Sequence, residues 1–319
     1  MSLRTIPKSY RKKNLLEFLE VNTGQGHSQT VYVLGLKSNF RGDSVLKVLQ
    51  ESGFQVIQAL ASTLDIEASN KFYSPISVKF REVMLGRNLS LAEIGCAISH
   101  LEIYQDILDR NLDSAIVLED DAILTQNFRQ IFDATSSFIG SKREAAIFSL
   151  FHDKCLIHRW RRTRTLNDSA GNFIRGGGYY PLAIPPYGAV GYVLNREACK
   201  KLLQSWNGVI FTADWPLIAI SSVKFFVSKR AYVLHPDITT STVEPHRSKM
   251  EFQSFMNQLN IFEQCKVRYR TAKEIEPKSK WRIFFAVYLQ IATDIKKGPY
   301  RIFSKMLFKN LLFDSQSWN

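Results

Sequence analysis

The sequence has no long uninterrupted hydrophobic run and few cysteines, and each absence excludes a class of protein. No stretch approaches the roughly 18 apolar residues that a membrane-spanning helix needs. The N-terminal stretch MSLRTIPKSYRKKNLLEFLE carries charges but no apolar centre, so it does not have the pattern of a secretory signal. The four cysteines are scattered and form no CxxC pair, which argues against a zinc ribbon or a dithiol redox centre and favours a reducing compartment. These absences predict a cytoplasmic protein.

Acidic residues are also in short supply. The chain has 42 Lys+Arg against 29 Asp+Glu, a formal net charge of +13. Such an excess favours an anionic partner, which can be nucleic acid, an acidic membrane surface or a phosphorylated substrate. A hydrophobic content of 45% over 319 residues is ample for a folded core and excludes a disordered chain.

Short apolar runs alternate with helical patterns along the chain. Strands are predicted for the runs at 30–36, 54–60, 114–118, 145–150 and 189–195, and shorter ones for KFFVS and AYVLH. Helices are predicted at 43–53, at 89–110, from Arg196 to about Trp206 and from near Asp214. This alternation predicts an α/β fold, with a Rossmann-type, mainly parallel sheet flanked by helices. In such sheets ligands bind at the carboxyl ends of the strands.

The predicted organisation has three parts. Residues 1–29 are polar and are interpreted as a lead-in segment, residues 30–250 as the main domain, and residues 251–319 as a basic, amphipathic helical C-terminal region. Within the main domain, residues 152–188 are basic and glycine-rich and are interpreted as irregular. The predicted helix at 89–110 opens with Ser90 and has Glu93 three residues later, which is the pattern of a capping box.

Three adjacent carboxylates follow the predicted strand at 114–118, in the stretch VLEDDA. Alternate residues of an extended backbone point the same way, so Glu119 and Asp121 are predicted to share one side of the strand end. Two hard oxygen ligands there suit Mn²⁺ or Mg²⁺, which also take phosphate oxygens of a substrate. A solvated acidic turn, or helix capping by Asp121, is the alternative. The pattern alone is shared by nucleases, phosphatases and nucleotide-sugar transferases.

Three longer motifs, taken together, resemble glycosyltransferase family 25. They are LSLAEIGCAISHLEIY, AIVLEDDAILTQNF and PPYGAVGYVLNREACKKLL, they occur in the family's order, and the likeness covers roughly residues 30–245. This is the lipooligosaccharide galactosyltransferase family, which also includes collagen galactosyltransferases. The resemblance implies a GT-A fold with an Asp-rich site for a metal ion and a nucleotide sugar. One departure is Gly35, where the family usually has an asparagine.

The resemblance also implies roles for individual residues. Glu119 and Asp121 are expected to hold the metal, and the whole triplet with Asp120 to hold the diphosphate of a UDP-sugar. Residues expected to contact the donor as well are Arg41, Tyr187, Gly188 and Gly191. For Arg41 a solvated loop position is the alternative, and for the glycines and tyrosine a flexible loop.

A catalytic base and a further metal ligand are expected in the last part of the domain. Asp214, in FTADWPL, lies where family 25 sequences usually have an aspartate, and we expect it to be the base, with helix capping as the alternative. His246, in STVEPHRS, is expected near the metal, and His235 is its competitor. His100, in the family's SH pair, is interpreted as a buried histidine satisfied by hydrogen bonds rather than as a substrate contact.

Two basic stretches favour an anionic partner. Residues 278–310 contain eight Lys/Arg and a single acid, and they place Arg301, Lys305 and Lys309 on one helical stripe beside an apolar one. This pattern suits an anionic membrane surface, although a helix docked on the core would also account for it. The stretch HRWRRTR at 158–164 fits RNA or a phosphorylated glycolipid, and no RNA-binding signature accompanies it.

These observations predict a glycosyltransferase that moves a sugar, galactose by the resemblance, from a UDP-sugar to a glycolipid or oligosaccharide acceptor with inversion. The expected setting is lipopolysaccharide or lipooligosaccharide core assembly at the cytoplasmic membrane face. One alternative is a metal-dependent nuclease or phosphohydrolase acting on nucleic acid. Another is a non-catalytic module that binds carbohydrate or membrane.

Overall fold

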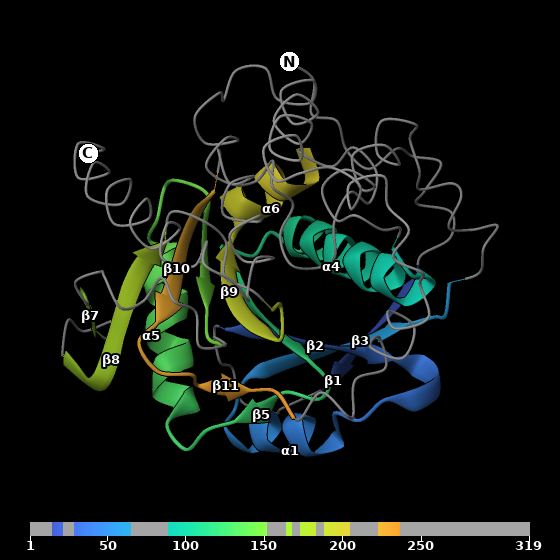
Figure 1. Cartoon of the computed structure of the whole chain (residues 1–319), viewed down its shortest axis with the longest axis horizontal. Helices are drawn as coiled ribbons and strands as arrows, with labels where there is room; N and C mark the ends of the chain where they lie inside the picture. Colours follow the sequence, from blue (N-terminus) through green and yellow to red (C-terminus); the bar gives the residue numbers. More distant parts are fainter. Residues whose placement is uncertain are drawn as a thin grey trace, which may run out of the picture. The chain divides into compact units, whose positions relative to one another are not determined.

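The computed structural model describes residues 15–21, 29–64, 89–151, 164–167, 173–182, 188–204 and 223–236 (Figure 1). The chain divides into two compact units, Met1–Arg81 with Arg87–Glu251 and Glu82–Gly86 with Phe252–Asn319, and every described residue belongs to the first. Among the described residues, no helix has the length and apolarity needed to cross a membrane. The predicted boundary between residues 250 and 251 and the amphipathic C-terminal region lie outside the described residues, and the predicted three-part division stays a prediction.

The described core is a nine-stranded sheet with the order β1-β3-β2-β4-β9-β6-β10-β8-β7. Its strands, in chain order, are β1 (Leu16–Val21), β2 (Thr30–Leu36), β3 (Gln55–Ala61), β4 (Ser114–Glu119), β6 (Ala146–Ser149), β7 (Arg164–Asn167), β8 (Phe173–Leu182), β9 (Gly191–Asn195) and β10 (Lys224–Ser228). A separate two-stranded sheet pairs β5 (Ile123–Leu124) with β11 (Val233–Leu234).

The sheet is mixed, which confirms the prediction of a mainly parallel one in part. β2, β3, β4, β6, β7 and β10 run in one direction, and β1, β8 and β9 run against them. Parallel pairing is confined to β3–β2, β2–β4 and β6–β10, while β9 lies antiparallel between β4 and β6. The reason lies in the order of elements. β6, β7, β8 and β9 follow one another without a described helix, and antiparallel strands need no helical crossover.

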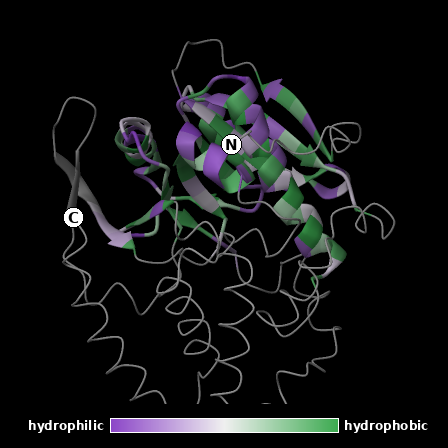
Figure 2. Ribbon diagram, turned by 90° about the horizontal axis from the view of Figure 1, so that it is seen from above, coloured by the Kyte–Doolittle hydropathy of each residue, from purple (hydrophilic) through white to green (hydrophobic). Residues whose placement is uncertain are grey.

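Helices cover both faces of the sheet, as predicted. Side chains alternate along β2. Val31 and Val33 belong to one buried cluster, together with residues of α1 (Asp43–Glu51) and α5 (Phe128–Gly140). Tyr32 and Leu34 belong to the other, together with residues of α4 (Leu91–Asp109) and α6 (Arg196–Gln204). Figure 1 shows α4 and α6 on one side of the sheet and α1 on the other. Because both faces are covered, the central strands read as nearly continuous apolar runs, while the helices alternate between hydrophobic and hydrophilic residues (Figure 2).

Several local predictions are confirmed. The Oγ of Ser90 accepts from the Glu93 N–H at 3.2 Å, and the Glu93 carboxylate accepts from the Ser90 N–H at 2.9 Å, so α4 opens with the predicted capping box. Gly53 has a φ of 79° and follows the end of α1, which agrees with its predicted role as a helix stop.

Other elements were not predicted. β1 lies within the segment interpreted as a lead-in, and β5 and then α5 follow the acidic triplet. β7 and β8 fall within residues 152–188, which the composition suggested were irregular. The cause is visible in β8, whose sequence FIRGGGYYPL has three consecutive glycines, residues that are normally depleted in strands. The helix predicted from near Asp214 lies outside the described residues.

Candidate metal centre at the end of β4

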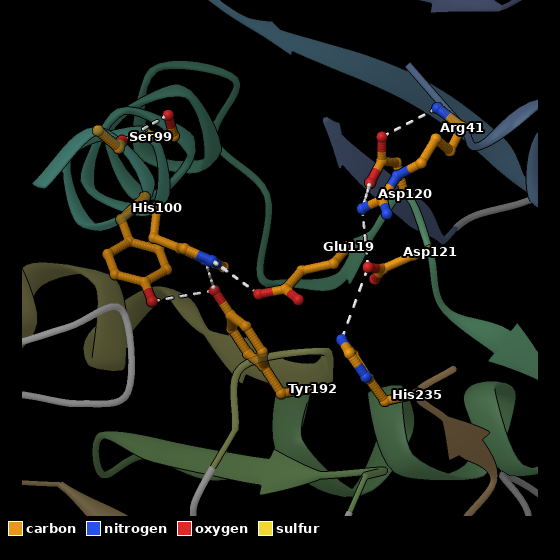
Figure 3. A network of polar contacts seen from close by, with 10 residues as sticks. Arg41, Ser99, His100, Glu119, Asp120, Asp121, Tyr192 and His235 are labelled. Carbon is orange, nitrogen blue, oxygen red and sulfur yellow. Dashed lines mark hydrogen bonds and ion pairs between the residues drawn. The ribbon is translucent and has the colours of Figure 1, made fainter. Parts of the chain in front are cut away.

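Glu119 is the last residue of β4, and the side chains of Asp121 and His235 lie near it (Figure 3). Ligand atoms of Glu119, Asp121 and His235 all lie within 4.8 Å of one another. The two carboxylates lie close together, as predicted, although Asp120 and Asp121 form a turn after β4 rather than continuing its extended backbone. β4 lies between β2 and β9, so the cluster occupies the carboxyl end of a central strand, where α/β sheets bind ligands.

Asp121 is nearly buried, and its two carboxylate oxygens differ. Its Oδ2 accepts from Nη2 of Arg41 at 2.8 Å and lies 3.5 Å from Nε2 of His235. Its Oδ1 is buried and has no hydrogen-bond partner within the described part of the chain. A buried carboxylate oxygen without a partner is costly, and a bound cation would satisfy it.

His235 presents the nitrogen that a cation requires. Its Nδ1 lies 2.5 Å from the carbonyl oxygen of Pro236, which can only accept, so Nδ1 is the donor. In the neutral tautomer with this bond, Nε2 keeps its lone pair. Metal-binding histidines usually donate their other ring N–H in this way, because that bond fixes the tautomer and the ring orientation.

The small sheet explains why His235 reaches the triplet. Leu234 pairs with Ile123, two residues beyond Asp121, so the β5–β11 register brings the two segments together. The sequence pattern favoured His246 and left His235 as the competitor. The structure brings His235 to the cluster, and His246 lies outside the described residues. A histidine immediately after the apolar run YVL was the signal that pointed to it.

Asp120 faces away from the cluster and forms an ion pair with Arg41. Its Oδ2 accepts the Arg41 backbone N–H at 3.0 Å, and its Oδ1 accepts from Nη2 of the same residue at 3.2 Å. Burial raises the pKa of Asp120, and the bonds from Arg41 partly offset that rise. In this arrangement the two residues bind each other, and their contact with the donor stays a prediction.

Gly35 leaves room for the ion pair between Asp120 and Arg41. A Cβ at position 35 would lie 2.4 Å from Oδ2 of Asp120, closer than real Cβ atoms approach. The glycine that departs from the family's asparagine thus provides the space in which the Asp120 carboxylate lies.

The two described glycines that were expected to contact the donor have packing reasons of their own. A Cβ on Gly191 would lie 2.8 Å from Val233, so the missing side chain lets β11 approach β9 two residues before His235. Gly188 has a φ of 82°, and a Cβ there would lie 2.5 Å from the Phe151 ring. Their contact with a donor sugar stays a prediction, as does that of Tyr187, which lies outside the described residues together with Asp214.

A buried polar chain reaches Glu119 from the other side. Nδ1 of His100 is 2.7 Å from the hydroxyl of Tyr192, which in turn is 2.9 Å from the hydroxyl of Tyr104. Nε2 of His100 is 4.0 Å from Oε1 of Glu119, and the Glu119 side chain extends toward it (Figure 3). Burial lowers the pKa of His100 to about 4, so the ring is neutral at neutral pH. The prediction of a buried histidine is confirmed, although only one of its nitrogens is hydrogen-bonded within the described residues.

The residues of the cluster fit a divalent cation. Two carboxylates supply hard oxygen ligands, and the unpartnered Oδ1 of Asp121 has the place of a ligand atom. An imidazole ligand suits Mn²⁺ better than Mg²⁺, because Mg²⁺ is usually bound by oxygen ligands and water alone. The donor set therefore fits a divalent cation of the kind that the sequence predicted.

Comparisons with known proteins agree with the motif resemblance. A model of the family described as Glycosyltransferase family 25 (LPS biosynthesis protein) matches residues 28–216. Procollagen galactosyltransferase 2 of Mus musculus and of Homo sapiens are each 28% identical over 107 residues, which are 31% of this chain and 17% of the relative. A "Probable inactive glycosyltransferase 25 family member 3" of Bos taurus is 25% identical over 126 residues, 40% of this chain and 20% of the relative. The chain thus spans a fifth or less of the length of these curated relatives.

Proposed function

Because this chain belongs to glycosyltransferase family 25, as its motifs predicted, we propose that it transfers a sugar from a nucleotide-sugar donor to a saccharide acceptor. The observation that carries the proposal is the convergence of Glu119, Asp121 and His235 at the end of β4, within the matched residues or directly tied to them. UDP-galactose is the proposed donor, and inversion the proposed outcome at the anomeric carbon. The galactose assignment draws on the names of the two procollagen galactosyltransferases.

Each described residue has a defined task in this proposal. Glu119 and Asp121 would supply anionic oxygens, and His235 a neutral nitrogen, to hold Mn²⁺. When bound, the cation offsets the negative charge that develops on the departing UDP. Arg41 and Asp120 hold the loop after β2 against the loop after β4, which keeps Asp121 in place.

Proton transfer from the acceptor is assigned to a carboxylate outside the described residues. Asp214 is the proposed base, since a carboxylate within hydrogen-bond reach can remove the proton of an attacking hydroxyl. The matched region ends at residue 216, so Asp214 falls inside it.

The proposed acceptor is a glycolipid or oligosaccharide of the lipopolysaccharide core, in keeping with the description of the matching family. The net charge of +13 supports a phosphorylated glycolipid and an anionic membrane surface as partners. On this basis we place the enzyme at the cytoplasmic face of the membrane, attached through the basic stretch at 278–310.

A donor screen tests the proposal directly. The purified protein is mixed with each nucleotide sugar in the presence of Mn²⁺, and binding is followed by the melting temperature and turnover by release of UDP. We expect UDP-galactose to raise the melting temperature only with Mn²⁺, and EDTA to abolish turnover.

Other outcomes would favour other functions. Cleavage of RNA without turnover of any nucleotide sugar would point to a metal-dependent nuclease. Binding of saccharide or anionic vesicles without turnover of any donor would point to a non-catalytic module, comparable to the family member that is named as inactive.

A further inference from the structure

A second group of ligand atoms lies on the other side of Glu119. Ligand atoms of Cys96, His100 and Glu119 all lie within 4.8 Å of one another. Cys96 and His100 are four residues apart on α4, so their side chains share one face of the helix. Cys96 is half-buried, which leaves a route for an ion from solution.

His100 provides a second and independent observation. It is 2% exposed, and its Nε2 has no hydrogen-bond partner in the described part of the chain. This nitrogen points at Glu119, 4.0 Å from Oε1 (Figure 3). A buried nitrogen without a partner is uncommon, because burial without a hydrogen bond costs free energy.

The second ring nitrogen of His100, Nδ1, already has a hydrogen-bond partner that orients the ring. Its Nδ1 is bonded to Tyr192, whose hydroxyl is bonded to Tyr104. When Nδ1 donates to the Tyr192 oxygen, Nε2 keeps its lone pair and can bind a cation. Such a hydrogen bond on the remote nitrogen is the usual support of a metal-binding histidine.

We propose that Cys96, His100 and Glu119 form a second cation site, selective for thiophilic divalent ions such as Zn²⁺. The sulfur, nitrogen and oxygen of this group form a softer donor set than the two carboxylates and imidazole around Asp121. Three protein ligands with one open position are typical of accessible zinc sites. Binding releases the Cys96 proton to solvent, since the thiolate is the ligand.

Sharing of Glu119 links the two sites. One carboxylate cannot be fully committed to both cations, so Zn²⁺ on the α4 side draws Glu119 away from Asp121 and His235. Zn²⁺ therefore opposes Mn²⁺, and through it the reaction. This antagonism rests on the proposed function, whereas the existence of the second site does not.

Cobalt absorption tests the second site without any reference to activity. Co²⁺ replaces Zn²⁺ in such sites, and a cobalt–thiolate bond gives a near-ultraviolet charge-transfer band. We expect the full-length protein to show this band, Cys96→Ser to lose it, and His100→Gln to weaken Co²⁺ binding by ~10-fold or more. The matched control is Cys199→Ala, which removes a buried thiol outside the group and should keep the band.

Displacement of Mn²⁺ tests the sharing of Glu119. Bound Mn²⁺ is measured by electron paramagnetic resonance while Zn²⁺ is added, with wild type and Cys96→Ser side by side. We expect Cys96→Ser to need ~10-fold more Zn²⁺ for the same displacement. Zn²⁺ also competes directly at the Asp121 side, so only the difference between the two proteins counts.

The possible failures can be told apart. A missing thiolate band, or a band that persists in Cys96→Ser, would overturn the second site. Equal displacement in both proteins would overturn the sharing of Glu119 between the two sites. A thiolate band in a protein that turns over no nucleotide sugar would keep the second site and remove the proposed function. Circular dichroism of each variant establishes that a lost band reflects a lost ligand rather than unfolding.

Discussion

Asp120 and Asp121 are neighbours in the chain, yet the structure gives them opposite surroundings. On the Asp120 side, both carboxylate oxygens accept bonds from Arg41, and the side chain fills the space left by Gly35. On the Asp121 side, one oxygen faces Arg41 and His235, and the other is buried without a partner in the described residues. The Asp120 carboxylate is fully engaged by Arg41, whereas the Asp121 carboxylate has an oxygen that can still bind a ligand.

The difference shows how a binding site is held open. Asp120 and Asp121 lie in the turn after β4, where the Ala122 N–H donates to the Glu119 carbonyl, and within this turn the two carboxylates have different partners. Through Arg41, the Asp120 carboxylate ties the loop after β2 to the loop after β4. This tie holds Asp121 with one buried oxygen that needs a water molecule or a cation as its partner. Stability and binding are thus separated between adjacent residues, and substitutions should affect them separately.

The largest effect is expected from Asp121→Asn. The change removes one anionic ligand, and we expect Mn²⁺-supported turnover to fall by ~100-fold or more, since losing a ligand exceeds the ~10–100-fold cost of losing a group that supports one. The amide oxygen of the asparagine can still accept from Arg41, so the melting temperature should change little. Turnover and thermal unfolding are measured on the same preparation. Wild-type turnover in this variant, or in EDTA-treated enzyme, contradicts the metal assignment.

Asp120→Asn should show the reverse pattern. The amide nitrogen would face a guanidinium that can only donate, and we expect a loss of about 2–3 kcal/mol in the free energy of unfolding. Because Arg41 is partly exposed, water will limit this loss. Urea unfolding measures the loss, and Mn²⁺ affinity should fall less than in Asp121→Asn, because Asp120 positions Asp121 and is not itself a ligand. A variant with unchanged stability and lost metal binding would reverse the assignment of the two aspartates.

The third prediction concerns pH and extends the comparison to the His100 side of Glu119. Burial lowers the pKa of His100 from 6.5 to about 4, so below 6.5 the unfolded chain takes up a proton that the folded protein does not. Stability is therefore present above pH 6.5 and lost as the pH falls toward 4. Between about pH 7.5 and 5 this group should cost about 2 kcal/mol.

The matched variant for this test is His100→Gln, which does not titrate in that range. Urea unfolding at several pH values should show a steeper acid loss for wild type than for the variant. Parallel pH profiles would mean that His100 is protonated in the folded protein.

The smallest effect is expected from a pair of glycine substitutions, one on each side. Gly191→Ala brings a methyl group within 2.8 Å of Val233 and should move His235, weakening Mn²⁺ binding by ~10-fold. Gly35→Ala presses on Asp120 instead, and should lower stability by about 1–3 kcal/mol with little change in Mn²⁺ affinity. Calorimetric titration with Mn²⁺ compares the two, and equal affinities in both variants would contradict the role given to Gly191.

Features of the site that depend on local rules were predictable from the sequence. The triplet at the end of β4 and the capping box at Ser90 follow from strand and capping patterns, whereas the turn that places Asp121 beside Glu119 was not predicted. His235 required more. Its place depends on pairing between β5 and β11, two-residue strands that are far apart in the chain and too short to leave a periodic signal.

The fold divides in the same way. Central strands such as β2 were predictable because burial on both faces makes them continuously apolar. β1 and β8 were missed because edge position and glycine content hide their pattern, and the antiparallel place of β9 is a property of pairing partners rather than of its own residues. The reason for Gly35 was equally hidden, since it lies in the side chain of Asp120, which is remote in sequence.

The edge strand β1 sets a practical limit on how the protein can be trimmed. β1 covers one edge of β3 along its whole length, and the backbone N–H groups of Leu15 and Leu16 donate to the Glu102 carboxylate at 3.0 and 2.8 Å. A fragment cut at residue 28, where the family match begins, would strip that edge and leave Glu102 without these donors. Bare strand edges recruit other chains, so such a fragment would tend to precipitate, and a recombinant version for crystallisation should start ahead of residue 15.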